Sequence, residues 1–341
     1  MAPKRILVTG ASGCIGHYIT EALIQETNHE LYLLVRNPEK LQINCETRAG
    51  VTVIKADMLH IDQHADLLKT IDCAVLAATA WGGSQAVFDV NVGKTLRLMN
   101  LLDPDVCEQI IYFSTASVLD RNNELLKEAK ELGTDYIRSK YECLRQLSRL
   151  PINKRITALF PTLVLGGDSN KPYSHLSAGL PDVVKWINLI RFFKADGSFH
   201  FIHGQDIAQV VLHLIHYPPQ PDEPRNLVLG NERVTVNQAI EDACAYLNTK
   251  ILFRVTLSPW LADLLIAIFR IQMAAWDRFC VNYRHFTYLN PVSPDTFGLP
   301  TYCRTFTDVL KISRVGERTR MVNEETFNTE QSAEERESKR A

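Results

Sequence analysis

Short, continuously apolar runs alternate with amphipathic stretches over the first half of the chain. The stretches between the runs, such as 16–27 and 92–102, repeat apolar residues at the spacing of an α-helix. Uninterrupted apolar strands separated by helices are typical of a parallel sheet that helices cover on both faces. The pattern therefore predicts an α/β fold with a doubly wound parallel sheet. The six runs expected to form its strands are 5–10, 30–36, 51–57, 73–80, 109–117 and 155–166.

A glycine-rich turn joins the first apolar run to the first amphipathic stretch. Gly10, Gly13 and Gly16 are spaced three residues apart there, in the order G-x-x-G-x-x-G. Such a turn lets a pyrophosphate approach the main chain, and the helix that follows offers unpaired N–H groups and a partial positive charge. Dinucleotides bind in this way beyond the carboxyl ends of the strands of a Rossmann fold. The turn therefore predicts a pyrophosphate site; a tight turn without a ligand is the alternative.

The alternation breaks down after residue 166, where the chain becomes rich in proline and aromatic residues. We expect an NAD(P)-binding Rossmann domain over 1–166 and a mainly substrate-binding region over 167–315. Within that region, the pattern of 199–216 predicts a strand and a helix that return to the Rossmann sheet. The polar tail 316–341 has almost no apolar residues and is expected to be disordered.

Composition and charge argue against several other classes of protein. The 341 residues have a net charge of −2 and their basic residues are scattered, so no nucleic-acid partner is expected. The eight cysteines include no C-x-x-C pair, which is typical of reduced thiols in an intracellular protein. The chain enters its first apolar run within five residues and shows no signal peptide. We therefore expect a cytoplasmic protein.

The most apolar segment of the chain covers residues 260–279. Asp263, Arg270 and Asp277 interrupt it, so it makes a poor transmembrane span. We interpret it as a buried helix or as a helix packed at an interface. A helix that lies on a membrane surface is the less favoured alternative, because aromatic and basic residues are common in such helices. The residues that suggest this alternative are Trp260, Trp276, Arg270, Arg278 and Arg284.

A second informative stretch follows the fifth apolar run, which ends in three hydroxyl side chains within 114–117. Tyr136 and Lys140 are four residues apart in it, so they share one face of a helix. The spacing alone is weak, because Tyr246 and Lys250 repeat it. That second pair lies outside the alternation of strands and helices, and we reject it as a site.

These stretches together resemble the extended short-chain dehydrogenase/reductases, a group also described as NAD-dependent epimerase/dehydratase-like. The resemblance covers residues 4–247 and follows the order of motifs in that family. It implies a Rossmann fold, an NAD(P) cofactor and an oxidoreductase activity on a small-molecule substrate. The stretches that carry it are TGASGCIG, AAT, NVGKTLRLM, FSTASV, YIRSK, FPTLVLG, FIHGQDIA and LVLGNERVTVNQ.

The resemblance assigns catalytic roles to three residues. Tyr136 is similar to the family's proton donor or acceptor at the reacting carbonyl or alcohol, and Lys140 to the lysine that holds the nicotinamide ribose. Thr115 aligns with the residue that hydrogen-bonds the substrate oxygen. An ammonium group beside a phenol would lower the phenol's pKa from about 10 towards neutral, where proton transfer is efficient. The alternative is that Tyr136 and Lys140 are an ordinary pair on a helix surface.

Arg36 bears on the expected choice of cofactor. NAD-binding folds place an acidic residue at the adenosine ribose about 20 positions after the glycine loop, and Arg36 stands there instead. A guanidinium can pair with the 2′-phosphate of NADP through two hydrogen bonds, so NADP is favoured and NAD is the alternative. Asp57 resembles the family residue at the adenine, unless it only caps the next helix. The cofactor-binding residues that motifs and resemblance imply are Thr9, Gly10, Ser12, Gly13, Cys14, Ile15, Gly16, Arg36, Asp57, Met58, Ala77, Ala78, Tyr136, Lys140 and Pro161.

Three further residues have two interpretations each. Trp81 and Trp186 either line an apolar substrate pocket or belong to the core. His203 matches a recurrent position of the family, where a structural role is favoured over catalysis. We expect no metal ligands.

Departures from the family pattern narrow the function. Val118, Leu119 and Asp120 replace the V-Y-G common in nucleotide-sugar enzymes, and Leu76 replaces a histidine often found in the fourth strand. With Arg36, these changes favour an NADP(H)-dependent reductase that acts on the carbonyl or alcohol of an apolar or mixed small molecule. The alternatives are a nucleotide-sugar epimerase or dehydratase that uses NAD, and a non-catalytic NADP-binding sensor or assembly protein. The substrate, the direction and stereochemistry of transfer, and assembly into a homodimer stay open.

Overall fold

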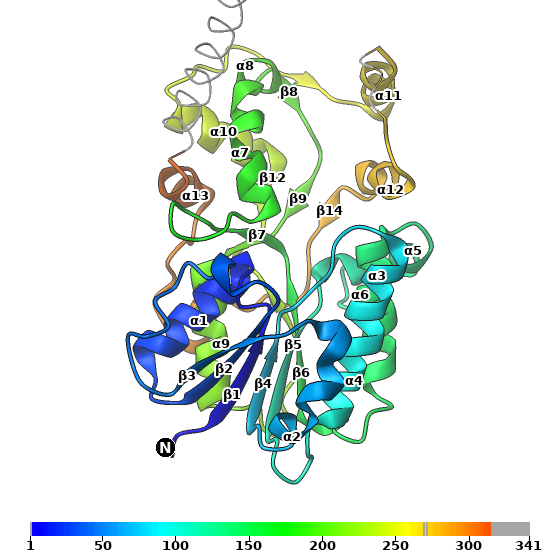
Figure 1. Cartoon of the computed structure of the whole chain (residues 1–341). Helices are drawn as coiled ribbons and strands as arrows, with labels where there is room; N and C mark the ends of the chain where they lie inside the picture. The colour runs from blue at the N-terminus through cyan, green and yellow to red at the C-terminus, as the bar shows by residue number, and fades with distance from the viewer. Residues whose placement is uncertain (1, 269, 271, 315–341) are drawn as a thin grey trace, which may run out of the picture.

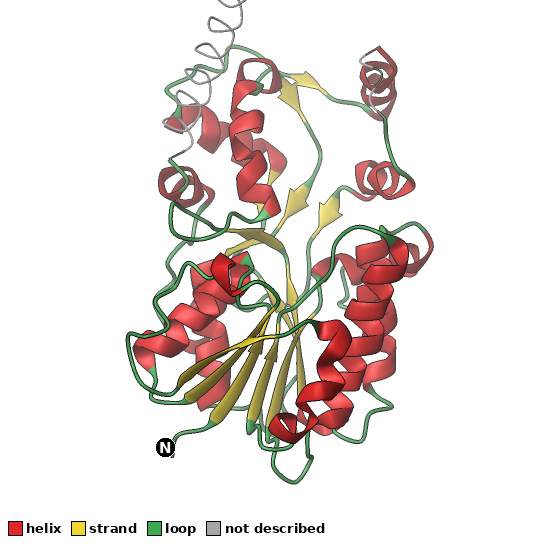
Figure 2. Cartoon of the chain, viewed as in Figure 1, coloured by secondary structure: helices red, strands yellow, loops and turns green. Residues whose placement is uncertain are grey.

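The chain folds around a parallel sheet of seven strands (Figures 1 and 2). The computed structural model describes residues 2–268, 270 and 272–314. The strands are β1 (Arg5–Thr9), β2 (Glu30–Val35), β3 (Val51–Lys55), β4 (Cys73–Leu76), β5 (Gln109–Phe113), β6 (Ile156–Pro161) and β11 (Asn226–Leu229). Their order is β11-β6-β5-β4-β1-β2-β3, and every neighbouring pair is parallel. This architecture confirms the predicted doubly wound α/β fold.

Burial explains why these runs form strands. Every residue of β4, β5 and β6 is buried, and so are four of the five residues of β1. Strands that are buried on both faces have continuously apolar sequences. After β3 at one edge of the sheet, the chain returns to place β4 beside β1. The direction of winding therefore changes between β1 and β4, and ligands of open α/β sheets bind at such a switch point.

Helices cover both faces of the sheet. The helices of the part of the molecule that contains this sheet are α1 (Cys14–Glu26), α2 (Ala65–Leu68), α3 (Ser84–Phe88), α4 (Thr95–Leu101), α5 (Lys127–Glu131), α6 (Asp135–Leu147) and α9 (Gly204–His216). α1 and α9 lie side by side on one face, and α4 and α6 lie on the other (Figure 1). Alternate residues of β1 divide between two cores: Ile6 and Val8 face the α1 side, and Leu7 faces the α4 side.

A second part of the chain lies beyond the carboxyl ends of the strands (Figure 1). Its helices are α7 (His175–Lys185), α8 (Ile187–Ile190), α10 (Val236–Tyr246), α11 (Pro259–Ile268), α12 (Ala275–Tyr283) and α13 (Phe306–Ile312). Its short strands are β7 (Leu163–Leu165), β8 (Phe193–Lys194), β9 (Ser198–Phe199), β10 (Phe201–His203), β12 (Val234–Thr235), β13 (Val255–Thr256) and β14 (His285–Phe286). Leu180, Phe201 and Leu310 belong to its own small core.

Two predicted elements differ from the structure. The expected strand 155–166 is two strands, because the N–H and the hydroxyl of Thr162 both bond the Leu229 carbonyl and end the pairing of β6. β7 then leaves the large sheet and pairs with β10. Within 199–216, α9 covers the large sheet but β10 does not join it, and β11 is the strand that completes its edge.

The prediction of one buried helix over 260–279 is wrong. Arg270 has a φ of +50°, which interrupts the helical path, and α11 and α12 are separate helices. The side chain of Trp260 is 68% exposed, whereas Trp276 in α12 is buried. No helix among the described residues is long and apolar enough to cross a membrane. The predicted disordered tail, 316–341, lies outside the described residues.

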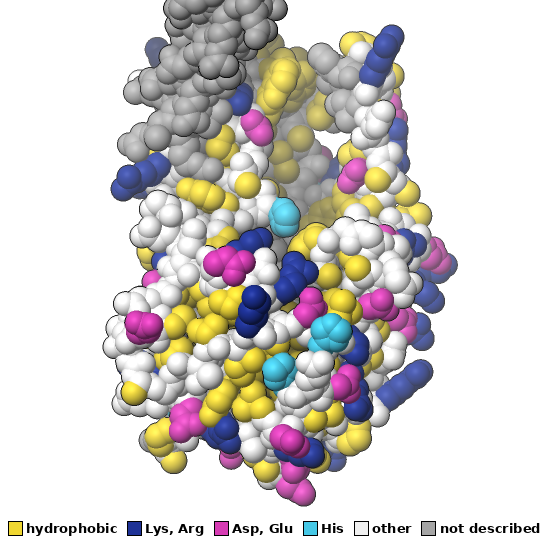
Figure 3. Space-filling view, in the orientation of Figure 1, with side chains coloured by type: hydrophobic (Ala, Val, Ile, Leu, Met, Phe, Trp, Pro, Cys, Tyr) yellow, Lys and Arg dark blue, Asp and Glu magenta, His cyan; other side chains and the backbone are white. Residues whose placement is uncertain are grey.

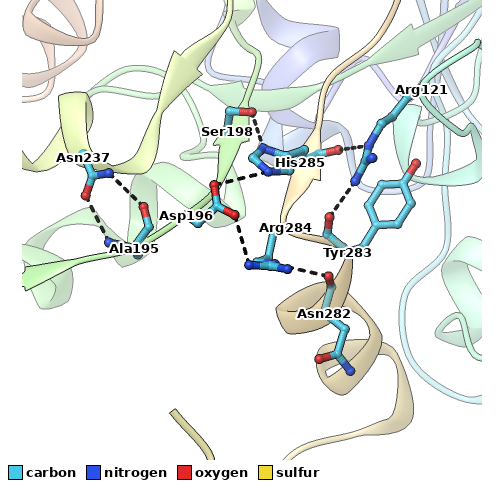
Figure 4. Close-up of polar contacts among 9 residues, drawn as sticks. All are labelled: Arg121, Ala195, Asp196, Ser198, Asn237, Asn282, Tyr283, Arg284 and His285. Atoms are coloured by element: carbon cyan, nitrogen blue, oxygen red, sulfur yellow. Dashed lines mark hydrogen bonds and ion pairs between the residues drawn. The ribbon is translucent and has the colours of Figure 1, made fainter. Parts of the chain in front are cut away.

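Polar contacts around β14 join the two parts of the molecule (Figure 4). The Arg121 guanidinium donates to the carbonyl oxygens of Tyr283, at 2.8 Å, and His285, at 3.1 Å. His285 Nδ1 shares a hydrogen bond of 2.9 Å with Ser198 Oγ, and its Nε2 lies 3.4 Å from Asp196. Ser198 is buried within the β12-β9-β14 sheet. These three side chains therefore hold strands together and do not present a nucleophile.

Candidate active site

The glycine loop between β1 and α1 is closely packed at two of its three glycines. A methyl group on Gly16 would lie 2.0 Å from the Gly10 carbonyl oxygen. A methyl group on Gly10 would lie 2.6 Å from the Ala78 nitrogen and 2.7 Å from the Ala77 carbonyl carbon, and Gly10 has a φ of +75°. Packing alone therefore requires glycine at these two positions.

Gly13 differs from these two glycines. It has a φ of −89°, and the nearest atom to a methyl group there would be the Gly10 oxygen, at an ordinary contact distance of 3.4 Å. The protein's own packing therefore does not require glycine at position 13. Gly13 is exposed and precedes the first turn of α1, whose leading N–H groups have no partner within the helix. A bare backbone at a helix N-terminus fits a phosphate group.

A cavity of about 550 Å³ opens beyond the carboxyl ends of β1, β4, β5 and β6. The glycine loop lines it together with residues that follow β5 and with the first turn of α6. The fold thus brings together segments more than a hundred residues apart in the sequence. The predicted site residues that line the cavity are Gly10, Gly13, Cys14, Ile15, Gly16, Ala77, Thr115, Tyr136, Lys140 and Pro161.

The other predicted cofactor residues do not line this cavity. They are Thr9, Ser12, Arg36, Asp57, Met58 and Ala78. Thr9 is buried, and its hydroxyl accepts a hydrogen bond of 3.2 Å from Ala78 N–H. Arg36 is exposed at the end of β2, and its guanidinium has no ion-pair or hydrogen-bond partner among the described residues. Asp57 is the N-cap of a short helix and accepts from the Leu59 N–H, at 2.9 Å.

Tyr136 and Thr115 meet in the cavity. Tyr136 is in the first turn of α6, which begins at the cap residue Thr134. The Tyr136 phenol lies beside the Thr115 hydroxyl, and both residues line the cavity. That hydroxyl also accepts a hydrogen bond from Ser117 N–H, at 3.3 Å. A phenol and a hydroxyl held together in this way can bind one oxygen of a ligand from two directions.

Lys140 lies one turn along α6 and is almost completely buried. Its Nζ donates to the Phe113 carbonyl at 2.8 Å and lies 5.2 Å from the centre of the Tyr112 ring. Burial lowers the pKa of Lys140 to about 8. An ammonium group has three donors, so the contact with Phe113 leaves two for a ligand.

The predicted lowering of the Tyr136 pKa is wrong for this structure. Burial raises the pKa of Tyr136 to about 12, and the neighbouring Thr115 hydroxyl opposes only part of that rise. The Lys140 ammonium is directed to the Phe113 carbonyl and does not counter the effect of burial. The phenol therefore carries its proton at neutral pH.

Ser114 places an unsatisfied polar atom at the cavity. Its side chain is 4% exposed and lines the cavity, and its hydroxyl oxygen has no hydrogen-bond partner among the described residues. A buried hydroxyl without a partner costs about 1–3 kcal/mol. A ligand with a polar group at this point would remove that cost. The open backbone at Gly13 and the free hydroxyl of Ser114 thus both fit a bound dinucleotide.

Asn91 is a positioning residue that the sequence analysis missed. It is fully buried in the π-helix Asp89–Lys94. Its side-chain oxygen accepts from Ala80 N–H at 2.8 Å, and its amide donates to Ser139 Oγ at 3.0 Å. Ser139 in turn donates to the Tyr136 carbonyl, at 2.7 Å. Asn91 therefore ties the chain after β4 to the turn of α6 that carries Tyr136; a polar residue inside an apolar helical stretch was the available signal.

Most of the remaining wall of the cavity is apolar, although Thr79, Thr162, Ser174 and His175 also line it. The Trp81 ring stacks on the Tyr136 ring at 4.2 Å, with 19° between the ring planes. Leu163, Tyr173 and Leu176 continue this wall. Lys140 is the only Lys or Arg among the described residues that line the cavity. This wall therefore suits an uncharged ligand with apolar surface.

Two other candidates lie outside the site. Trp186 is 60% exposed and does not line the cavity. His203 is buried, and its Nδ1 accepts from the Gln205 N–H at 3.1 Å, so it caps α9. Burial lowers the pKa of His203 to about 4. No cluster of metal-ligating side chains occurs among the described residues.

Comparison with known proteins gives one family and several similar folds. A sequence model described as the NAD dependent epimerase/dehydratase family matches residues 6–230, which confirms the resemblance carried by the motifs. No curated protein sequence matches the chain significantly.

Similar solved structures share the fold at low sequence identity. The crystal structure of gox2253 has a TM-score of 0.65 at 19% identity, over 91% of this chain and 98% of that chain. A nucleoside-diphosphate-sugar epimerase from Staphylococcus aureus has a TM-score of 0.61 at 18% identity, over 90% and 99%. The Bordetella bronchiseptica enzyme WbmG, in complex with NAD and UDP, has a TM-score of 0.60 at 14% identity, over 93% and 96%.

We predict that Gly13→Leu abolishes dinucleotide binding without unfolding the protein. The new side chain would cover the backbone at the helix N-terminus and block the phosphate. The protein should still fold, because there is space for a side chain at Gly13 and its φ is one that other residues adopt. Fluorescence titration with NADPH and NADH measures binding, and urea unfolding measures stability. The comparison variant Gly16→Ala should lose about 1–3 kcal/mol of stability from overpacking. Near-normal nucleotide affinity in folded Gly13→Leu protein would show that the loop is not the pyrophosphate site.

We predict that Asn91→Ala lowers the free energy of unfolding by about 1–3 kcal/mol, because it leaves buried hydrogen-bond partners unsatisfied. Asn100→Ala in α4 is the matched control, since that exposed side chain bonds only the Leu96 carbonyl and should change stability by about 0.5 kcal/mol or less. Urea unfolding measures both variants. Equal losses in the two variants would show that Asn91 has no special positioning role.

Proposed function

Because the chain belongs to the NAD dependent epimerase/dehydratase family, we propose that it is an NADP(H)-dependent oxidoreductase of the extended short-chain dehydrogenase/reductase type. It transfers hydride to or from the carbonyl or alcohol of a small molecule. The observation that carries the proposal is the placement of the Tyr136 phenol beside the Thr115 hydroxyl, inside the cavity that the glycine loop also lines.

Tyr136 acts as the proton donor when a carbonyl is reduced. A phenol whose pKa is raised to about 12 is protonated at neutral pH, which is the form that this direction requires. The Thr115 hydroxyl binds the same substrate oxygen and stabilises the charge that develops on it. Transfer of the proton from Tyr136 to that oxygen leaves a phenolate, which is reprotonated from solvent.

The cofactor would be held by the glycine loop, Ser114 and Lys140. The first turn of α1 and the bare backbone of Gly13 would hold the pyrophosphate, and the free donors of Lys140 would hold the hydroxyls of the nicotinamide ribose. The bound nicotinamide supplies the hydride. Lys140 would position the nicotinamide ribose, and Asn91 positions the turn of α6 that carries Tyr136. Tyr136 and Thr115 would touch the reacting oxygen.

Arg36 favours NADP over NAD. Its guanidinium is exposed at the end of β2 and has no partner among the described residues, so it is available for a 2′-phosphate. Asp57 remains a candidate for the adenine, although its side chain already caps a helix. NAD is the alternative cofactor, and it is the one named for the WbmG complex.

The lining of the cavity favours an uncharged substrate with apolar surface. A nucleoside diphosphate carries negative charges that proteins bind with Arg, Lys or helix N-termini. On the substrate side, the wall around Trp81, Leu163 and Leu176 contains no Arg or Lys, and it includes the ionisable side chain of His175. A nucleotide-sugar epimerase or dehydratase that uses NAD is the second candidate, favoured by the similarity to WbmG in complex with NAD and UDP and to a nucleoside-diphosphate-sugar epimerase. A sensor without catalysis is less favoured, because it would not need Tyr136 and Thr115 joined in the cavity.

We expect Arg36→Ala to weaken NADPH binding by about 1.5–3 kcal/mol, the usual contribution of a hydrogen bond to a charged group. NADH lacks the 2′-phosphate and should bind nearly as before, so the preference for NADPH falls about tenfold or more. Fluorescence titration with both nucleotides needs no knowledge of the substrate. Arg149→Ala is the control for loss of one exposed positive charge, at the end of α6. Equal losses of affinity for NADH and NADPH in Arg36→Ala would show that Arg36 does not bind the 2′-phosphate.

We expect Tyr136→Phe to slow turnover by about 10² or more and to leave NADPH affinity intact, because the phenol touches the reacting oxygen and not the adenosine end. Turnover is followed as NADPH oxidation with a panel of apolar ketones, aldehydes and enones. Tyr141→Phe removes a phenol from the same helix and should turn over like the wild type.

The nucleotide that copurifies with the wild-type protein separates the two enzyme classes. Exchangeable NADPH is expected for the reductase, whereas tightly held, oxidised NAD together with turnover of nucleotide sugars would overturn it. An active Tyr136→Phe variant would refute the assigned proton donor.

A further inference from the structure

An apolar stripe on α11 faces away from the rest of the protein. Trp260, Leu264 and Ile268 are four residues apart, so their side chains share one face of the helix. Their exposures are 68%, 45% and 62%, although these residue types are usually buried. In Figure 1, α11 stands at the edge of the molecule, joined to the rest through α12 and the strand β13. The described part of the chain thus leaves this stripe uncovered.

Neighbouring segments extend the apolar surface. β13 pairs with β8, and the rings of Phe192 and Phe253 stack at 4.9 Å. Leu252 and Phe253 are 78% and 61% exposed just before β13, and Trp186 is 60% exposed at the start of α8. Because β13 leads directly into α11, these residues lie at the same end of the molecule. We call this end the apical surface; its exposed apolar residues are Trp186, Leu252, Phe253, Trp260, Leu264 and Ile268.

Basic residues accompany the apical surface. The segments 185–194 and 247–284 contain eight Lys or Arg and two Asp. Four of the eight are paired with carboxylates: Lys185 with Asp182, Arg254 with Glu241, Arg278 with Asp263 and Arg284 with Asp196. Lys194, Lys250 and Arg270 have no carboxylate partner among the described residues. Figure 3 shows dark blue Lys or Arg side chains beside yellow apolar ones at the upper right, over α11. The surface therefore combines exposed aromatic and aliphatic groups with unneutralised positive charge.

This combination fits an anionic lipid surface better than a second copy of the chain. A symmetric dimer would place the same patch of each subunit against the other. The unpaired Lys and Arg residues would then face each other, which costs free energy by like-charge repulsion. Anionic lipid headgroups neutralise these charges, and the headgroup–acyl boundary takes up tryptophan and leucine side chains. α11 has ten residues and no described helix can cross a membrane, so the contact is superficial.

We propose that the apical surface docks the protein on anionic membranes. The stripe of Trp260, Leu264 and Ile268 enters the headgroup–acyl boundary, and Lys194, Lys250 and Arg270 lie against lipid phosphates. This surface is separate from the cavity of the active site, and the proposal does not depend on the proposed reaction. It assigns the uncovered face of α11 to one partner, a lipid bilayer with negative headgroups.

Cosedimentation of the full chain with vesicles tests the proposal. We expect binding to phosphatidylcholine vesicles that contain phosphatidylserine, little binding to pure phosphatidylcholine, and loss of binding as salt screens the charges. Leu264→Ser should weaken binding about fivefold or more. Leu59→Ser is the matched control, because that leucine is 42% exposed on the Rossmann part, against 45% for Leu264. Circular dichroism and NADPH titration verify that each variant is folded.

A charge variant tests the electrostatic half of the contact. Lys194→Gln, Lys250→Gln and Arg270→Gln together should weaken binding about tenfold or more. Lys69→Gln, Arg149→Gln and Lys154→Gln remove three exposed positive charges near the amino ends of the strands and should have little effect. No binding by the wild type, or equal binding by apical and control variants, would overturn the proposal. A dimer in light scattering that Leu264→Ser dissociates, without vesicle binding, would assign the surface to a second copy instead.

Discussion

The close approach between the glycine loop and the chain that leaves β4 is the contact on which the active site depends. Gly10 has no room for a side chain because the backbone of Ala77 and Ala78 lies against it, and Gly16 brings α1 equally close to the Gly10 carbonyl. These contacts place the N-terminus of α1 at the switch point between β1 and β4. Gly13 is then left as bare backbone at the cavity. Gly10 and Gly16 are therefore required by the protein's own packing, whereas Gly13 is available to a ligand.

The chain after β4 is also held from its other side. Thr9 bonds Ala78 near the glycine loop, while Asn91 bonds Ala80 and reaches α6 through Ser139. The segment between these two attachments therefore couples the glycine loop to the helix that carries Tyr136. A buried network of this kind is rigid only when every member has its partner, because an unpaired polar group in the interior is costly. The glycine loop and the first turn of α6, on two sides of the cavity, are in this way parts of one hydrogen-bonded framework.

Burial sets the chemistry of the cavity as much as the identity of its residues does. It raises the pKa of Tyr136 and lowers that of Lys140, since a low dielectric environment disfavours the charged form of each. Trp81 contributes to that burial by stacking on the phenol. The mainly apolar wall that keeps Tyr136 protonated also contains no Arg or Lys for a charged substrate. The protonation state and the proposed substrate class therefore have a common physical origin. The apical surface combines exposed apolar groups with positive charge, and so has a different character from the cavity.

The sequence by itself determined the elements whose signals are local. Strands buried on both faces appear as continuous apolar runs, the three glycines mark the turn into α1, and the spacing of Tyr136 and Lys140 places them on one helical face. The tertiary structure alone decided the departure of β7 from the large sheet, the linking role of Asn91, the raised pKa of Tyr136 and the exposure of α11. Each of these depends on what lies across a contact from a residue far away in the chain. Local spacing records the periodicity of a segment, but burial and hydrogen-bond partners are set by the segments packed against it.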